Sequence, residues 1–118
     1  MSQLDLNVLD KQIDSDPYQI LEFKGTLDKA NIDDVKPALN NFAENFSDQC
    51  LIFDMRYFEF INSEGVGLMV SLFYMLQKKN IKLVLLKLQP QVMDVCEAMG
   101  LTKIVPTYEL LEEVIKNI

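Results

Sequence analysis

The residue types from which a chemical function is expected gather in one short segment, residues 61–67, with the sequence Ile-Asn-Ser-Glu-Gly-Val-Gly. The segment follows an apolar stretch and leads into an apolar run of helical length, so the Ser63 hydroxyl is placed where a loop enters a helix. The first N–H groups of a helix have no partner within it, and the helix dipole is positive at that end. Such an end accepts a capping side chain, a carboxylate, or a phosphate that the serine itself carries.

Ser63 is predicted to be a site of modification or docking rather than a nucleophile. The 118-residue chain contains no histidine, which excludes Ser-His-Asp and Cys-His catalysis and histidine metal sites. Its glycines form neither a GxGxxG motif nor a Walker A motif, so nucleotide binding is not expected. Asp28 and Asp54 would act as a catalytic pair only at a defined separation beside a substrate pocket, and both are also explained as strand-end residues. We therefore expect no enzymatic activity, no metal site and no cofactor.

The composition favours an acidic protein that binds another protein. A net charge of −7 argues against nucleic acid and anionic membranes, which attract clusters of lysine and arginine. The N-terminal residues have neither the basic region nor the apolar core of a signal peptide, and no segment reaches about 18 uninterrupted apolar residues. Cys50 and Cys96 lie far apart among apolar neighbours, which favours reduced core thiols over redox or metal-binding residues. A cytoplasmic location and a single domain, residues 1–118, are expected.

Strands and helices alternate in the predicted structure. Apolar–polar alternation over residues 4–10 and 18–23 predicts a hairpin. Apolar residues then recur at spacings of three and four over residues 32–46, which is typical of an amphipathic helix. Pro37 fits only in a first turn or at a kink, so this helix is expected to begin near Asp33 or Asp34.

The rest of the chain predicts further strands and helices. They are, in chain order, a strand at 51–55, a helix at 64–79, a strand at 81–86, a helix from Pro90 to its stop at Gly100, a strand at 103–105 and a helix at 109–118. The last helix is expected to turn five apolar residues inward: Leu110, Leu111, Val114, Ile115 and Ile118. This order predicts an α/β fold with a mainly parallel sheet of four to five strands, about four helices packed on it, and the hairpin on one side.

The helix that follows Ser63 is apolar on two sides. At about 100° per residue, its inward stripe is expected to consist of Val66, Met69, Val70, Phe73 and Leu76. Leu68 and Met75 fall on the opposite side with Tyr74 at its margin, and Gly67 and Ser71 leave a shallow strip there. A helix of this kind is buried twice, either within its own domain or against a partner, and the sequence favours neither.

Four motifs, in this order, resemble the STAS domain of bacterial anti-sigma-factor antagonists. They are residues 25–28 (Gly-Thr-Leu-Asp), Asp54, residues 60–67 (Phe-Ile-Asn-Ser-Glu-Gly-Val-Gly) and residues 98–101 (Ala-Met-Gly-Leu). Length and element order agree with that family over the whole chain. The resemblance implies a STAS-like fold, with a single STAS domain over residues 1–118.

The resemblance also implies a phosphorylation switch. In this family the serine that corresponds to Ser63 is phosphorylated by a serine kinase that is also an anti-sigma factor. The unmodified antagonist binds that kinase and frees a sigma factor, and the phosphorylated form lets go. The sequence departs from the family twice, with Asn62 in place of Asp and Glu64 in place of Ser or Thr. An alternative is a non-switching STAS scaffold, or an accessory subunit of a larger complex such as a membrane transport system.

The resulting hypothesis is a surface around Ser63 that binds a protein partner, the anti-sigma factor serine kinase. By resemblance, Asp28 lies close to the phosphorylated loop. The expected partner-binding residues are Asp28, Asn62, Ser63, Glu64, Gly65, Gly67, Leu68, Ser71 and Met75. A phosphate on Ser63 would add about −1.5 to −2 charges and act mainly on whatever docks over the loop. The simpler role, in which Asn62 or Ser63 caps the helix, can hold at the same time. No nucleic-acid partner and no direct membrane insertion are expected, and a weak homodimer stays open.

Overall fold

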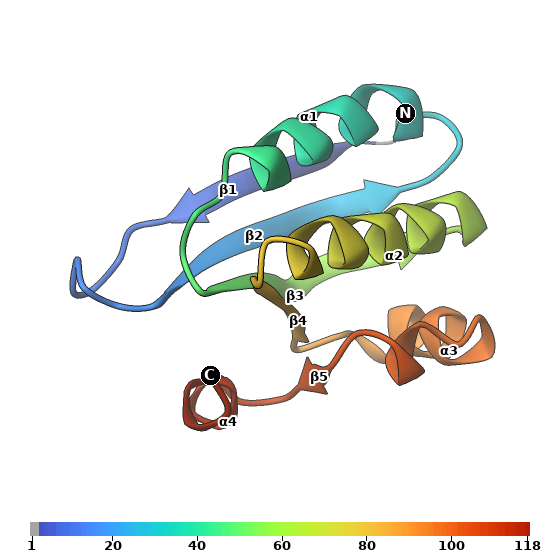
Figure 1. Ribbon diagram of the computed structural model, residues 1–118. Coiled ribbons are helices and arrows are strands. Elements are labelled where there is room, and N and C mark those ends of the chain that lie inside the picture. Colours follow the sequence, from blue (N-terminus) through green and yellow to red (C-terminus); the bar gives the residue numbers. More distant parts are fainter. Residues whose placement is uncertain (1–2) are drawn as a thin grey trace.

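A five-stranded sheet organises the computed structural model, which describes residues 3–118 (Figure 1). The strands are β1 (Leu4–Leu9), β2 (Tyr18–Leu27), β3 (Cys50–Ile61), β4 (Lys82–Leu86) and β5 (Thr107–Tyr108), in that spatial order. The helices are α1 (Ile32–Glu44), α2 (Ser63–Gln77), α3 (Pro90–Ala98) and α4 (Leu111–Lys116), with a 3₁₀ turn η1 (Leu101–Lys103) after α3. β1 pairs antiparallel with β2 and the other neighbouring strands pair in parallel, which confirms the predicted α/β fold. No helix in the described range has the length and apolarity to cross a membrane.

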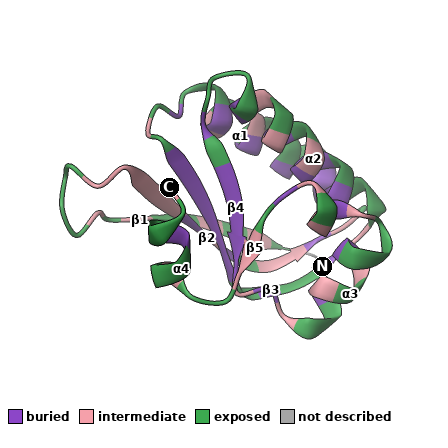
Figure 2. Ribbon diagram, turned by 60° about the horizontal axis from the view of Figure 1, so that its bottom comes forward, coloured by how far each residue is buried: buried purple, intermediate pink, exposed green. Residues whose placement is uncertain are grey.

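The two faces of the sheet are covered unequally. The large buried cluster joins α1, α2 and α3 to one face, and a smaller cluster joins α4 to the other (Figures 1 and 2). Side chains of β3 alternate accordingly: Leu51 and Phe53 belong to the large cluster, and Cys50 and Ile52 belong to the small one. The sheet face under α4 is therefore the less protected of the two.

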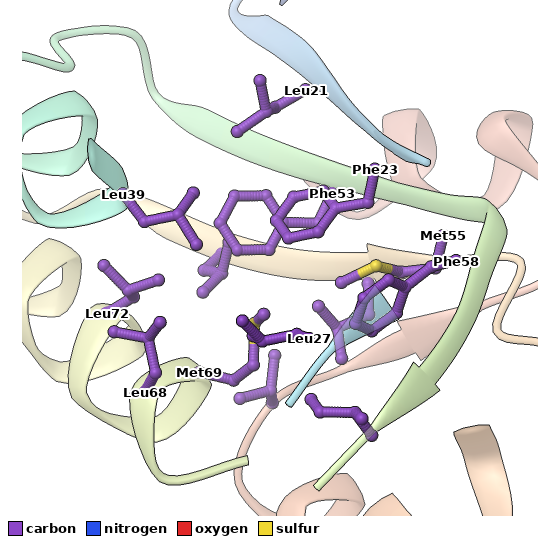
Figure 3. Close-up of a cluster of buried hydrophobic side chains, with 14 of the residues drawn as sticks. Leu21, Phe23, Leu27, Leu39, Phe53, Met55, Phe58, Leu68, Met69 and Leu72 are labelled. Carbon is purple, nitrogen blue, oxygen red and sulfur yellow. The ribbon is translucent and has the colours of Figure 1, made fainter. Parts of the chain in front are cut away.

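The large cluster is centred on aromatic rings of β2 and β3. The ring centroids of Phe23 and Phe53 lie 4.7 Å apart, and Phe58 meets Phe23 edge-on at 5.6 Å. Figure 3 shows Met69 and Leu72 pointing into this cluster from α2. Burial of these side chains holds α2 firmly against the two central strands.

α1 and α2 lie side by side (Figure 1), and one lysine ties their C-terminal ends together. Lys79 Nζ donates to the carbonyl oxygens of Ala43, Glu44 and Phe46 at 3.0, 2.8 and 2.8 Å. These carbonyls lie in the last turn of α1 and just beyond it, where a cation is favoured by hydrogen bonding and by the helix dipole. Because both helices follow parallel strands, their N-terminal ends also lie together, at the opposite edge of the sheet.

Two boundaries in the first half of the chain differ from the sequence prediction. α1 begins at Ile32, which places Pro37 beyond the first turn, on an exposed side of the helix where its missing N–H donor is tolerated. β3 continues past residue 55 to Ile61, because Phe58 and Ile61 are also buried in the large cluster. The longer β3 brings the start of α2 close to the end of β2.

The predicted strand at residues 103–105 is wrong. Gly100 has a φ of 78° and provides the expected left-handed stop of α3, but the chain then forms the 3₁₀ turn η1. Val105 is fully buried in the large cluster instead of lying in the sheet. Strand pairing begins only where Leu85 N–H donates to the Pro106 carbonyl oxygen at 2.9 Å, so β5 is two residues long.

α4 is shorter than the predicted last helix and faces the sheet through one narrow stripe. Leu111, Val114 and Ile118 belong to the small cluster. Leu110 and Ile115, which were expected to point inward, are 48% and 46% exposed. Only positions three and four apart share a helix face, so this short helix covers a limited part of β3 and β4.

Candidate partner-binding site

Two loops meet where β2 and β3 end. Leu27 and Ile61 are partners in the parallel ladder, and the Asn62 N–H donates to the Leu27 carbonyl oxygen at 3.2 Å. The residues that follow the two strands, Asp28 and Asn62, are therefore close in space. Loops after parallel strands converge at this edge of a sheet, which is where α/β proteins commonly place their binding residues.

Asp28 lies in a hydrogen-bonded turn that precedes α1. Its Oδ1 accepts from the Ala30 N–H at 2.9 Å, and its own N–H donates to Asn31 Oδ1 at 3.0 Å. Asn31 is 7% exposed and donates from Nδ2 to the Thr26 carbonyl oxygen at 2.8 Å. Asn31 is not among the residues predicted from the sequence, although an Asp followed three residues later by Asn, just before an apolar helix, is a typical turn signal.

Asn62 and Ser63 have different roles at the start of α2. Asn62 is the N-cap: its backbone is extended (φ −102°, ψ −178°), and its Oδ1 accepts from the Gly65 N–H at 2.9 Å. Ser63 is the first helical residue and is exposed, and its hydroxyl makes no hydrogen bond within residues 3–118. Of the two capping candidates, Asn62 is therefore the one that caps, and the Ser63 hydroxyl is open to solvent.

The two glycines of the first turns have opposite surroundings. Gly65 is buried, and a Cβ added there would lie 2.6 Å from Ile61 Cγ1 and 3.1 Å from Leu27 Cδ2. Gly67 is exposed, and a Cβ added there would meet no atom of the described chain within 4 Å. Gly65 thus allows α2 to start close to the strand ends, whereas the packing of the domain itself does not require a glycine at position 67.

A shallow groove of about 260 Å³ runs between the first turns of α1 and α2. Its α2 side is lined by four of the predicted residues, Glu64, Gly67, Leu68 and Ser71, and its α1 side is lined by Ile32, Asp33 and Lys36. The α1 residues were missed because the sequence prediction considered only one helix. The α1 residues could have been predicted from the parallel order of β2 and β3, since this order places the starts of successive helices next to each other. The structure thus brings residues from two helices into one groove beside Ser63.

The expected orientation of α2 is partly wrong. Leu68 is 4% exposed and belongs to the large cluster, although it was expected on the side away from the core. Leu72 is fully buried and was missing from the predicted stripe, while Phe73 is only partly buried. The physical reason is that α2 packs against both the sheet and α1, so its buried arc is wider than a single stripe and is centred closer to α1.

Met75 does not lie in the groove. It is partly buried against the large cluster and lies about 18 Å farther along the axis of α2 than Ser63. Tyr74, beside it, is 47% exposed and its ring packs edge-on against Phe73 with centroids 5.4 Å apart. The groove and Met75 are therefore separate parts of the α2 surface.

Asp54 and the two cysteines are buried within the domain, as structural residues are. Asp54 is 3% exposed in the middle of β3, where its carboxylate accepts from the Arg56 N–H at 3.0 Å and faces Arg56 Nη2 at 3.4 Å. Burial raises the pKa of Cys50 to about 11, although nearby Lys82 opposes this shift, and burial also raises the pKa of Cys96 to about 11. Both thiols are therefore uncharged near neutral pH.

Among the described residues no group of three or more Cys, Asp or Glu side chains could hold a metal ion.

Comparison with known proteins identifies one family. The profile of the STAS domain family matches residues 9–114. No curated protein sequence matches the chain.

Several solved structures share its fold. An anti-sigma factor antagonist from Mycobacterium paratuberculosis is 18% identical, with a TM-score of 0.80, and the match covers 98% of this chain and 94% of that chain. The unphosphorylated form of the Bacillus antagonist SpoIIAA is 20% identical, with a TM-score of 0.69 and coverage of 99% and 95%. A sulfate transporter family protein from Wolinella succinogenes is 13% identical, with a TM-score of 0.71 and coverage of 86% and 84%. At these identities the likeness establishes the fold alone.

Proposed function

Because the chain belongs to the STAS domain family, we propose that it is an anti-sigma-factor antagonist whose binding is switched by phosphorylation. With Ser63 unmodified, it binds an anti-sigma factor that is also a serine kinase, and the sigma factor is released. With Ser63 phosphorylated, it lets go of that partner. The likeness to antagonists from Mycobacterium paratuberculosis and Bacillus supports this function, and SpoIIAA is described in both an unphosphorylated and a phosphorylated form.

The observation on which the proposal rests is the exposed Ser63 hydroxyl beside a groove. Asn62 satisfies the Gly65 N–H, so a modification of Ser63 leaves the cap in place. The first intrahelical bond runs from the Val66 N–H to the Asn62 carbonyl oxygen, and the N–H groups of Ser63 and Glu64 precede it. A phosphate at this position therefore meets free helix N–H groups and the positive end of the dipole, both of which stabilise it.

The phosphate stabilised in this way by the helix end disfavours binding of the partner. In the proposed contact surface, Asp33 and Glu64 line the groove and Asp28 follows β2 at the same end of the sheet. Among the described residues that line the groove, Lys36 is the basic one. This acidic surface fits a partner surface that offers lysine or arginine near the groove and acidic or closely packed groups over Ser63. A phosphate adds about −1.5 to −2 charges and the volume of three oxygens directly beneath such a partner, which weakens binding without unfolding the domain.

Phosphorylation by the cognate kinase tests the proposal. In the presence of ATP, wild-type protein should gain one phosphate, and peptide mapping should place it on Ser63. Ser71→Ala is the matched control, because Ser71 is also exposed and lines the same groove. Ser71→Ala should be modified as efficiently as wild type and Ser63→Ala should not be modified. Incorporation that persists in Ser63→Ala would exclude Ser63 as the acceptor.

A second function is favoured by the likeness to the sulfate transporter family protein. In that case the chain is a non-switching scaffold or accessory subunit that binds through the same surface. Asn62 and Glu64, at positions where antagonists commonly have Asp and Ser or Thr, are compatible with this alternative. Partner affinity that is the same for wild type, Ser63→Ala and Ser63→Asp, with or without ATP, would support the scaffold.

A further inference from the structure

A half-open cavity of about 320 Å³ lies at the far end of α2 from Ser63. Its walls come from elements on both faces of the sheet: Phe73 at the end of α2, Val84 in β4, and Val114 and Ile118 at α4. Figure 1 shows α2 and α4 on opposite sides of the sheet, with β4 between them. The cavity is thus separate from the groove at Ser63, and the two share no lining residue.

The cavity exists because the sheet is incomplete at this edge. β5 pairs only with Leu85 and Leu86, so the first half of β4 has no strand on its outer side within the described chain. Pro106, which lines the cavity and precedes β5, has no N–H with which to extend the ladder. α4 is too short to cover the space that remains.

The lining combines apolar walls with one cation, and none of the described residues that form it has an acidic side chain. Lys82 lines the cavity, and its Nζ donates to the Asn117 carbonyl oxygen at 2.8 Å, which leaves two of the three ammonium donors for another acceptor. In a protein with a net charge of −7, a cavity whose charged lining residue is a lysine is a local exception, and Lys82 favours an anionic group there.

The inner wall of the cavity is apolar and buried. Cys50, Leu83 and Val114 line the cavity and are 0%, 1% and 1% exposed. The raised pKa of Cys50 has the same cause, since burial among apolar groups disfavours the thiolate. Ligand sites typically have this combination of an apolar interior and a few polar groups that fix orientation.

We propose that this cavity binds a small amphipathic anion, with an apolar body on the Val84 and Val114 wall and a carboxylate at Lys82. A cavity of about 150 Å³ accommodates benzene, so this one has room for roughly ten non-hydrogen atoms. The Tyr108 and Gln77 side chains, which also line the cavity, are polar groups that can hydrogen-bond the anionic end.

Titration with octanoate, followed by calorimetry and by methyl NMR, tests the proposal on the intact chain. Octanoate should bind saturably at one site and shift the methyl signals of Val84, Val114 and Ile118, while those of Leu68 in the distant groove stay in place. Octylammonium has the same chain with the opposite charge, and it should bind at least about tenfold more weakly. Failure of octanoate to saturate, or equal affinity for both probes, would overturn the proposal.

Matched variants locate the site. Lys82→Gln should lower octanoate affinity by at least about fivefold and reduce the preference over octylammonium. Lys36→Gln makes the same charge change in the other groove and should leave octanoate affinity unchanged. Ile118→Trp, at the partly exposed C-terminal end, should fill the cavity and abolish binding while the melting curve stays cooperative. Equal loss in Lys82→Gln and Lys36→Gln, or undiminished binding in folded Ile118→Trp, would place the ligand elsewhere. None of these measurements depends on the partner of Ser63.

Discussion

Asn62 and Ser63 are adjacent in the chain but contribute differently to the molecule. The Asn62 amide oxygen satisfies a helix N–H, whereas the Ser63 side chain is exposed and its hydroxyl makes no hydrogen bond within the described structure. Stability and switching are thereby assigned to separate side chains. Asn62 also provides this cap without a charge, so a phosphate on Ser63 has a neutral side chain before it in the chain and one carboxylate, Glu64, after it.

This separation predicts unequal costs of substitution at the two positions. Asn62→Ala should lower the free energy of unfolding by about 1 kcal/mol, because the Gly65 N–H loses its acceptor. Ser63→Ala should change it by less than about 0.5 kcal/mol, as expected for an exposed side chain without partners in the domain. Urea unfolding of both variants measures the difference. Equal destabilisation would mean that Ser63 shares the capping role.

The two glycines offer a second matched pair. Gly65→Ala should destabilise the domain by about 1–3 kcal/mol, because the new Cβ lies 2.6 Å from Ile61 Cγ1 in a closely packed site. Gly67→Ala should stabilise it by up to about 1 kcal/mol, since alanine favours a helix interior and meets no atom within 4 Å. Thermal unfolding distinguishes the two. We also expect Gly67→Ala to weaken partner binding, because its methyl group projects into the groove. Unchanged affinity would exclude position 67 from the interface.

α2 shows how far a helix can be understood from its own sequence. Its position, its apolar character and its entry at Asn62 follow from local pattern, and so do the hairpin of β1 and β2 and the stop of α3 at Gly100. The buried side of α2 does not follow, because contact with α1 brings Leu68 and Leu72 inward and leaves Phe73 only partly covered. The residues of α1 that line the groove were missed for the same reason: they belong to the site only through the pairing of two helices. β5 was misplaced because the apolar residue Val105 fills the core instead of the sheet.

The burial of Leu68 within its own domain determines the cost of substitutions on this side of α2. Leu68→Ala should cost about 2–5 kcal/mol of unfolding free energy, as large-to-small substitutions in a core do. Tyr74→Ala, on the same helix but 47% exposed, should cost much less, although its edge-on contact with Phe73 is lost. Denaturant unfolding gives both values. A tolerated Leu68→Ala would mean that α1 and α2 are less closely packed in solution than they are in this structure.

The molecule as a whole places acidic side chains near the start of α2 and one lysine in the cavity beyond its far end. Asp33 and Glu64 line the groove at the start of α2 and Asp28 follows β2 at the same end of the sheet, whereas Lys82 lines the cavity beyond the far end of α2. Two surfaces of opposite charge are thus separated by the length of α2. The small cluster beneath α4 is the thinner of the two cores, and it contains Cys50.

The two buried thiols give stability a pH dependence in the alkaline range. Their pKa is raised from 9.0 to about 11 in the folded protein, so the folded state binds protons more tightly than the unfolded state. The resulting stabilisation is complete below pH 9 and is lost as the pH rises through about 11. The free energy of unfolding should therefore fall more steeply over this range in wild type than in the Cys50→Ala, Cys96→Ala double variant. Parallel pH profiles for the two proteins would show that the thiols are not responsible.

The central claim is that phosphate on Ser63 opposes the partner while the domain tolerates it. The most direct measurement is calorimetric titration of the anti-sigma factor kinase with unmodified and Ser63-phosphorylated protein, alongside their melting curves. Phosphorylation should weaken binding by at least about tenfold, or about 1.4 kcal/mol, while the melting temperature barely changes. Equal affinity of the two forms, or loss of binding that is explained by unfolding of the phosphorylated form, would contradict it.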